Sequence, residues 1–140
     1  MYEFRHATTA ELKHFYEAPA LPPMLAAWGL FVHAELKGAC GVVLDPRDTG
    51  SILEDDARAI AFFDLRLEDA PPSVSLDIVR RVRNWLRDFG RTVWAQHDDK
   101  FPQAEKFLKV IGFRPTGHMR GDLQNTGRML QMFVRPADTK

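Results

Sequence analysis

Two titratable side chains lie in strand-like apolar segments, and both have the chemistry to move a proton. Asp64 lies within AIAFFDLRLE (59–68), and His97 ends RTVWAQH (91–97). Histidine is the group that most readily exchanges protons near neutral pH, and a carboxylate can act as a base directly or through water. The ordinary alternatives are a solvated carboxylate on a strand face and a polar histidine at a strand end, and the sequence leaves both open.

Other familiar kinds of site are disfavoured. His97, Asp98 and Asp99 are consecutive, and consecutive side chains converge poorly on one metal ion, so no metal site is predicted. Cys40 is the only cysteine and lies in the apolar run GACGVVL, which favours a small buried side chain over a nucleophile. Neither a nucleophile elbow nor a Walker-type phosphate loop occurs.

Arginines recur at helical spacing along SLDIVRRVRNWLRDFG (75–90) and just beyond it. They are Arg80, Arg83, Arg87 and Arg91. Three interpretations stay open: a solvated helix face with local ion pairs, a docking face for an acidic protein partner, or a contact with phosphate groups, whose geometry suits arginine.

Length and charge restrict the class of protein. The chain has 140 residues, which fits one domain over 1–140, and 19 basic residues balance 19 acidic ones. Zero net charge disfavours a dedicated nucleic-acid binder. No apolar run reaches the length of a membrane span, and MYEFRHATT lacks a signal-peptide core. We therefore expect a soluble cytoplasmic protein without a membrane partner.

Hydrophobic periodicity divides the chain into strands and helices. The predicted strands cover 2–7, 29–45, 59–68, 91–97, 114–121 and 127–135, and 29–45 is expected to fold into two strands around a tight turn at Lys37-Gly38. The predicted helices cover 8–18, 75–90 and 101–111, with a short helical turn at 24–28. This order, β-α-(α)-β-β-β-α-β-α-β-β, predicts an α/β fold with a mixed sheet and helices on both faces.

The stretch AEKFLKVIGF (104–113) shows how one of these helices ends. Gly112 can adopt the left-handed conformation that terminates a helix, and Phe113 can then return to the core. A helix that carries Ala104 and ends on Gly-Phe before a strand, within this element order, resembles the GCN5-related N-acetyltransferase (GNAT) superfamily. The resemblance covers nearly the whole chain.

The resemblance implies an acetyl-CoA site. In the family, the pantetheine arm pairs with the fourth strand, and the following loop and helix start bind the pyrophosphate through backbone N–H groups. On that template the cofactor-binding residues here are Leu65, Leu67, Ser73, Val74 and Ser75. Asp64 and His97 become the candidate bases for acyl transfer to an amine, with His33 and Glu35 as further candidates.

Several positions depart from the family pattern. The loop DAPPSVS has no glycine, Pro71 and Pro72 lack N–H groups, and Asp77 would repel an anion. Phe101 stands where the family often has asparagine, and Leu108 where it often has the tyrosine that protonates the leaving thiolate. These departures predict a protein that is weakly active or inactive.

The alternative function is that of a non-catalytic structural or interaction protein. The segments SLDIVRRVRNWLRDFG, TVWAQH and KFLKVIG are similar to parts of the GNAT-like internal virion proteins of short-tailed phages. That similarity implies a location in the virion and contacts with other subunits. The apolar segment MLQMFV (129–134) could also pair across a homodimer.

Overall fold

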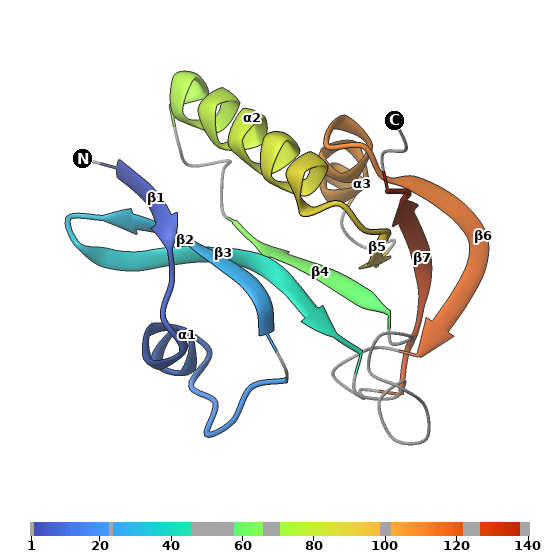
Figure 1. Ribbon diagram of the computed structural model, residues 1–140, viewed down its shortest axis with the longest axis horizontal. Coiled ribbons are helices and arrows are strands. Elements are labelled where there is room, and N and C mark those ends of the chain that lie inside the picture. The colour runs from blue at the N-terminus through green and yellow to red at the C-terminus, as the bar shows by residue number, and fades with distance from the viewer. Residues whose placement is uncertain are drawn as a thin grey trace. The chain divides into compact units, whose positions relative to one another are not determined.

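The computed structural model describes residues 2–22, 24–45, 58–65, 71–98, 102–121 and 127–137. The elements follow in the order β1 (Tyr2–His6), α1 (Thr9–Tyr16), β2 (Met24–Val32), β3 (Glu35–Leu44), β4 (Ala59–Asp64), α2 (Pro72–Phe89), β5 (Val93–His97), α3 (Pro102–Val110), β6 (Arg114–Gly121) and β7 (Met129–Arg135). The predicted α/β class is confirmed (Figure 1).

The chain divides into two compact units, Met1–Leu76 and Asp77–Lys140, with the boundary inside helix α2. The expectation of a single domain over 1–140, with helices on both faces of its sheet, stays a prediction. No helix in the described part of the chain is both long and apolar enough to cross a membrane.

In the first unit, β1 to β4 form an antiparallel sheet in sequence order. Helix α1 packs on one face of it, where Leu12 contacts a buried cluster with Ala27 and Ala39 (Figure 1). Gly41 lies on the same face, and a Cβ there would come within 2.9 Å of the Phe62 ring and 2.3 Å of the Ala26 carbonyl oxygen. The ring can therefore lie against the β3 backbone only because the residue is glycine.

The short helical turn predicted at 24–28 is wrong, because these residues begin strand β2. Ala26 pairs with Val42 and Ala27 with Gly41 in the register with β3. Alanine has a high helix propensity, but burial of this face against α1 outweighs the local preference.

The hairpin turn predicted at Lys37-Gly38 is also wrong. The turn is formed by His33 and Ala34, which have φ angles of 51° and 67°. Gly38 instead lies inside β3 and pairs with Leu30, while Leu36 pairs with Phe31, so Lys37 is the extra residue of a β-bulge. The glycine in this segment marks a bulge rather than a turn.

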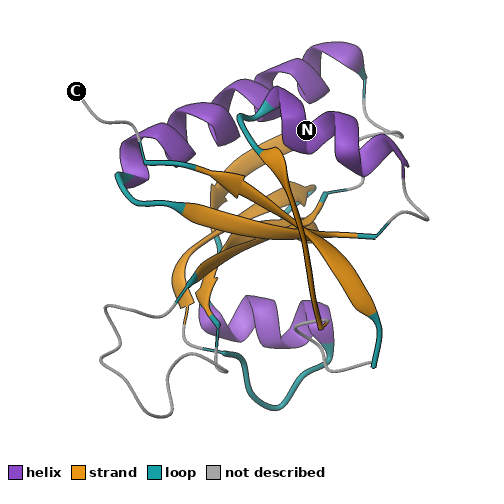
Figure 2. Cartoon of the chain, turned by 90° about the vertical axis from the view of Figure 1, so that its right-hand side faces the viewer, coloured by secondary structure: helices purple, strands orange, loops and turns teal. Residues whose placement is uncertain are grey.

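In the second unit, the strands lie in the order β5-β7-β6, with β7 antiparallel to both neighbours. Helices α2 and α3 lie on one side of these strands (Figure 2). Arg135, the last residue of β7, donates to the carbonyl of Leu86 in α2 and to that of Ile111 just after α3. The predicted helices and strands of this region are confirmed to within a few residues.

Candidate functional site

A tyrosine and an aspartate meet where α1 and β4 end. Tyr16 is the last residue of α1, Asp64 is the last residue of β4, and the Tyr16 hydroxyl donates a hydrogen bond to Oδ2 of Asp64. The Tyr16 ring meets the rings of Phe15 and Phe62 edge-on, with centroids 4.9 Å and 6.2 Å away. This aromatic packing holds the hydroxyl over the exposed carboxylate, so one carboxylate oxygen has a fixed donor within the protein.

The electrostatics of this pair keep the tyrosine neutral. Burial raises the pKa of Tyr16 above its ordinary value, and the hydrogen bond to Asp64 and the charge of that carboxylate raise it further. Tyr16 is therefore a permanent hydrogen-bond donor at neutral pH. It is poorly suited to give up its proton in a reaction.

Cys40 lies in β3 and is fully buried. Burial raises the pKa of its thiol to about 12, and the nearby charge of Asp64 acts in the same direction. The thiol consequently stays protonated, and a thiolate is needed for nucleophilic attack. The expectation of a small buried side chain is confirmed.

His97 ends β5, as the sequence predicted, but it is only 4% exposed. Its ring meets that of Phe133 edge-on at 5.4 Å, and within the described residues its Nδ1 has no hydrogen-bond partner. Next to it, Asp98 is held by Arg128 through two hydrogen bonds of 2.5 Å and 3.0 Å. An imidazole enclosed in this way exchanges protons with a substrate less readily than an exposed carboxylate does.

The two further candidates, His33 and Glu35, lie at the β2–β3 turn. His33 is an exposed turn residue with a positive φ, and Glu35 begins β3 and forms an ion pair with Lys37 at 3.2 Å. The turn position of His33 and the ion pair of Glu35 account for both residues without a catalytic role.

The residues predicted to bind acetyl-CoA lie at the end of β4 and the start of α2. Leu65 is half-buried directly after β4, whereas Leu67 lies outside the described residues. Ser73, Val74 and Ser75 form the first turn of α2, which begins at Pro72. These three are the residues whose N–H groups would have to bind a pyrophosphate.

The N–H groups of this first turn are nearly all unavailable. Those of Val74 and Ser75 donate to the Pro71 carbonyl at 3.0 Å and 3.1 Å, and Pro71 and Pro72 have none. The Ser75 bond is the usual first bond of a helix, so the four positions that an ordinary helix start leaves free are here 71 to 74. Two of them are prolines and the Val74 N–H is already bonded, so within the described residues that of Ser73 remains. The residues present therefore fit a pyrophosphate poorly, in agreement with the departures seen in the sequence.

Leu108, at the position of the family's general acid, is a core residue of α3. It is 4% exposed, and its carbonyl accepts a hydrogen bond from the Phe113 N–H. Ile111 and Phe113 are buried as well, whereas Ala104 is exposed and Phe101 lies outside the described residues. Position 108 thus contributes packing to the fold and no proton donor.

Sequence reasoning missed Tyr16. The partner of Asp64 lies 48 residues earlier in the chain, and its spacing with Leu12 and Phe15 indicated only an apolar helix face. No local motif could have found it, because the pair exists only once α1 has packed on the sheet.

No protein-family model matches the sequence, and no curated protein does either. Solved structures match along nearly the whole chain. A GNAT-family acetyltransferase from Streptococcus pneumoniae has a TM-score of 0.64 and 12% identity over 99% of this chain and 100% of that one. The ribosomal-protein-S18-alanine N-acetyltransferase from Escherichia coli has a TM-score of 0.63 and 13% identity over 100% of this chain and 96% of that one.

A third similar structure is that of AAC(6')-Ib in complex with paromomycin and acetyl-CoA. Its TM-score is 0.54 and its identity 11%, over 96% of this chain and 93% of that one. At such identities the likeness shows the fold alone. The chain has the GNAT fold, as the resemblance predicted.

Proposed function

We propose that this chain is an acetyltransferase-like protein that transfers acetyl groups weakly or not at all. The observation that carries the proposal is the start of α2, where two of the four positions whose N–H groups a helix normally leaves free are prolines and the N–H of Val74 is bonded to the Pro71 carbonyl. Within the described residues this leaves the Ser73 N–H for a phosphate. The buried Leu108 supports it, because an apolar side chain cannot protonate a leaving thiolate.

The test is a titration with acetyl-CoA, followed by thermal unfolding and calorimetry. A ligand present at 100 times its dissociation constant stabilises a fold by about 2.7 kcal/mol, which would raise Tm by several degrees for a chain of this size. We expect no such shift at about 1 mM acetyl-CoA, a concentration 100 times a dissociation constant of about 10 µM. A dissociation constant in the micromolar range would contradict the proposal.

A gain-of-function variant sharpens this test. Pro71→Gly with Pro72→Gly restores two N–H groups at the start of α2, and we expect it to bind acetyl-CoA more tightly than the natural sequence. The matched control is Pro102→Gly, which makes the same change at the start of α3. If the double variant and the control bind alike, the prolines do not limit binding.

If transfer does occur, Asp64 is the better candidate base of the two that the sequence suggested. One of its oxygens accepts from Tyr16, and the carboxylate is exposed, so its other oxygen can accept a proton or a hydrogen bond from an amine. Tyr16 positions that carboxylate. Asp64→Asn should abolish any residual transfer and Tyr16→Phe should weaken it, whereas loss of transfer only in His97→Ala would favour His97 instead.

The second candidate function is a non-catalytic interaction protein, of which a phage internal virion component is one form. Arg80 and Arg83, two exposed residues of α2 that make no ion pair or hydrogen bond within the described residues, favour it. For this function we propose a cytoplasmic location, or a location in the virion if the protein is a phage component. We also propose that β7 pairs with its copy across a homodimer. Micromolar binding of acetyl-CoA would count against this function and for the enzyme.

A further inference from the structure

Helix α2 has one apolar side and one arginine-rich side. Ile78, Val82 and Leu86 are buried, whereas Arg80, Arg83 and Arg87 are exposed. With a rise of 1.5 Å per residue, these three arginines lie in a row about 10 Å long. We call this row the arginine stripe.

Arg91 does not belong to the stripe, although its spacing in the sequence suggested that it would. It lies beyond Gly90, after α2 has ended at Phe89, and it is half-buried. The stripe is therefore shorter than the sequence predicted, and it ends with the helix.

Most charges on α2 are paired, but two are not. Arg81 pairs with Asp77 at 3.1 Å, and Arg87 pairs with its neighbour Asp88 at 3.4 Å. Within the part of the chain that the structure describes, Arg80 and Arg83 make no ion pair or hydrogen bond. The N-terminal part of the stripe thus presents two guanidinium groups, one helical turn apart, to the solvent.

We propose that the arginine stripe binds a short acidic segment of a partner protein. Each guanidinium can hold one carboxylate through two parallel hydrogen bonds, so carboxylates one helical turn apart would match Arg80 and Arg83. The occupant is a peptide rather than a nucleic acid because the ion pairs of Asp77 with Arg81 and of Asp88 with Arg87 add no net positive charge on either side of Arg80 and Arg83. A phosphate backbone continues its negative charge past both ion pairs and needs a longer run of unpaired cations, whereas an acidic segment of about one or two turns does not.

The probe is a fluorescently labelled, alanine-based helical peptide of about 15 residues, with glutamates one turn apart and lysines at both ends. Fluorescence anisotropy measures its binding to the full chain at low and at high salt. We expect saturable binding that weakens with salt and disappears when the glutamates are replaced by glutamine. No binding at about 1 mM protein would overturn the proposal, since affinities weaker than this carry no specific recognition.

Two double variants locate the binding surface. Arg80→Ala with Arg83→Ala should weaken peptide binding about fivefold or more, the loss expected for two exposed charge pairs. The control, Lys106→Ala with Arg114→Ala, removes the same net charge from exposed positions on α3 and β6 and should leave binding within about twofold. Equal losses in both variants would mean that net charge alone attracts the peptide, and would overturn the assignment of the surface.

The choice of partner is tested with a single-stranded oligonucleotide and with phosphatidylserine vesicles, at the same salt concentration. We expect neither to compete with the acidic peptide. Tighter binding of the oligonucleotide or the vesicles, lost in Arg80→Ala with Arg83→Ala, would show that the stripe recognises phosphate groups and would overturn the proposal. These outcomes do not depend on acetyl-CoA, so they are separate from the test of transferase activity.

Discussion

Helices α1 and α3 end in the same hydrogen-bond pattern, but they use different residues to form it. In α1 the N–H of Glu17 donates to the His14 carbonyl at 3.2 Å, and the N–H of Ala18 to the Lys13 carbonyl at 3.0 Å. In α3, Gly112 and Phe113 make the equivalent bonds at 3.1 Å and 2.9 Å. Both are Schellman motifs, with a left-handed residue just after the helix.

The difference lies in the left-handed residue itself. Glu17 has a φ of 52°, which an L-amino acid can adopt at some cost, whereas Gly112 has a φ of 105°, well outside that region. A Cβ at Gly112 would also lie 3.0 Å from Nε of Arg135. The end of α3 therefore requires glycine, and the end of α1 only tolerates a side chain.

The largest effect should come from removing that glycine. Gly112→Ala should lower the free energy of unfolding by about 1–3 kcal/mol, because a strained φ of this kind carries a cost of that size. The measurement is urea denaturation followed by circular dichroism. The matched control is Gly90→Ala after α2, where φ is 77° and the nearest atom to a new Cβ is 3.9 Å away. Equal losses in the two variants would show that contact with Arg135 adds nothing.

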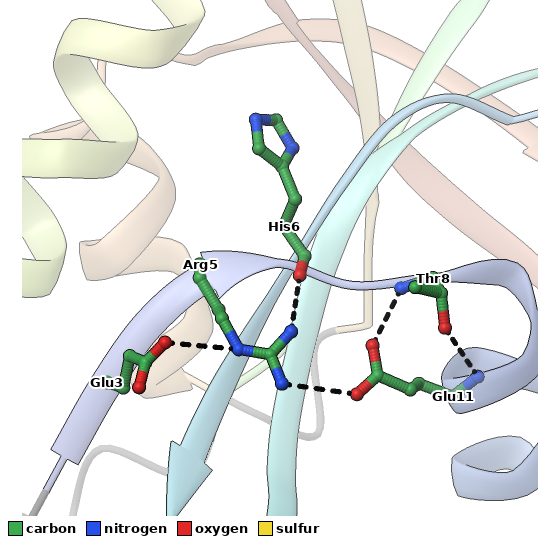
Figure 3. Close-up of polar contacts among 5 residues, drawn as sticks. All are labelled: Glu3, Arg5, His6, Thr8 and Glu11. Atoms are coloured by element: carbon green, nitrogen blue, oxygen red, sulfur yellow. Dashed lines mark hydrogen bonds and ion pairs between the residues drawn. The ribbon is translucent and has the colours of Figure 1, made fainter. Parts of the chain in front are cut away.

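The start of α1 also differs from the end of α3, because side chains rather than a glycine satisfy its free backbone N–H groups. The Thr8 hydroxyl accepts from the Glu11 N–H at 3.1 Å, and the Glu11 carboxylate accepts from the Thr8 N–H at 2.9 Å (Figure 3). Thr8→Ala should therefore cost about 1 kcal/mol of unfolding free energy, the usual loss for such a cap. The control is Thr9→Ala, an exposed neighbour already inside the helix. If both variants lose the same amount, the capping box contributes no specific stability.

These helix ends also show what a sequence can predict. The end of α3 was predictable because Gly112 and Phe113, which are adjacent in the sequence, indicate a helix end by themselves. Helix α2 was predictable for the same reason, since its apolar periodicity lies within one continuous segment. The turn at His33 and Ala34 was not, because neither residue is glycine and their positive φ angles are imposed by the pairing of β2 with β3. The strand at 24–28 and the Tyr16–Asp64 bond were missed for a related reason, since both depend on partners far along the chain.

A smaller effect, of opposite sign, is expected at the end of α1. Glu17→Gly removes the cost of a left-handed side chain, about 1–2 kcal/mol, but adds about 0.5–1 kcal/mol of backbone freedom to the unfolded chain. The variant should thus gain roughly 0.5–1 kcal/mol, measured by the same denaturation. Glu17→Ala keeps the side-chain cost and should show no gain. A gain in both would mean that the glutamate itself, rather than its conformation, destabilises α1.

The smallest effect concerns the charge of Glu11, and it depends on pH. The backbone hydrogen bond from Thr8 lowers the pKa of Glu11, and the side chain of Arg5, 3.3 Å away, lowers it further (Figure 3). Because the folded pKa lies below the unfolded value of about 4.3, the charge contributes stability above that pH and loses it as the pH falls through the folded pKa. Glutamine is also accepted at this position of a capping box, so Glu11→Gln removes mainly the charge.

The difference in Tm between the natural chain and Glu11→Gln should consequently be greatest near pH 7 and shrink below about pH 4. A difference that stays constant down to pH 3 would show that the amide fails as a capping group and that the charge contributes little. We expect this pH dependence at the start of α1 and not at the end of α3. The start of α1 is held by ionisable and hydroxyl side chains, whereas the end of α3 is held by a backbone conformation that no change of pH can alter.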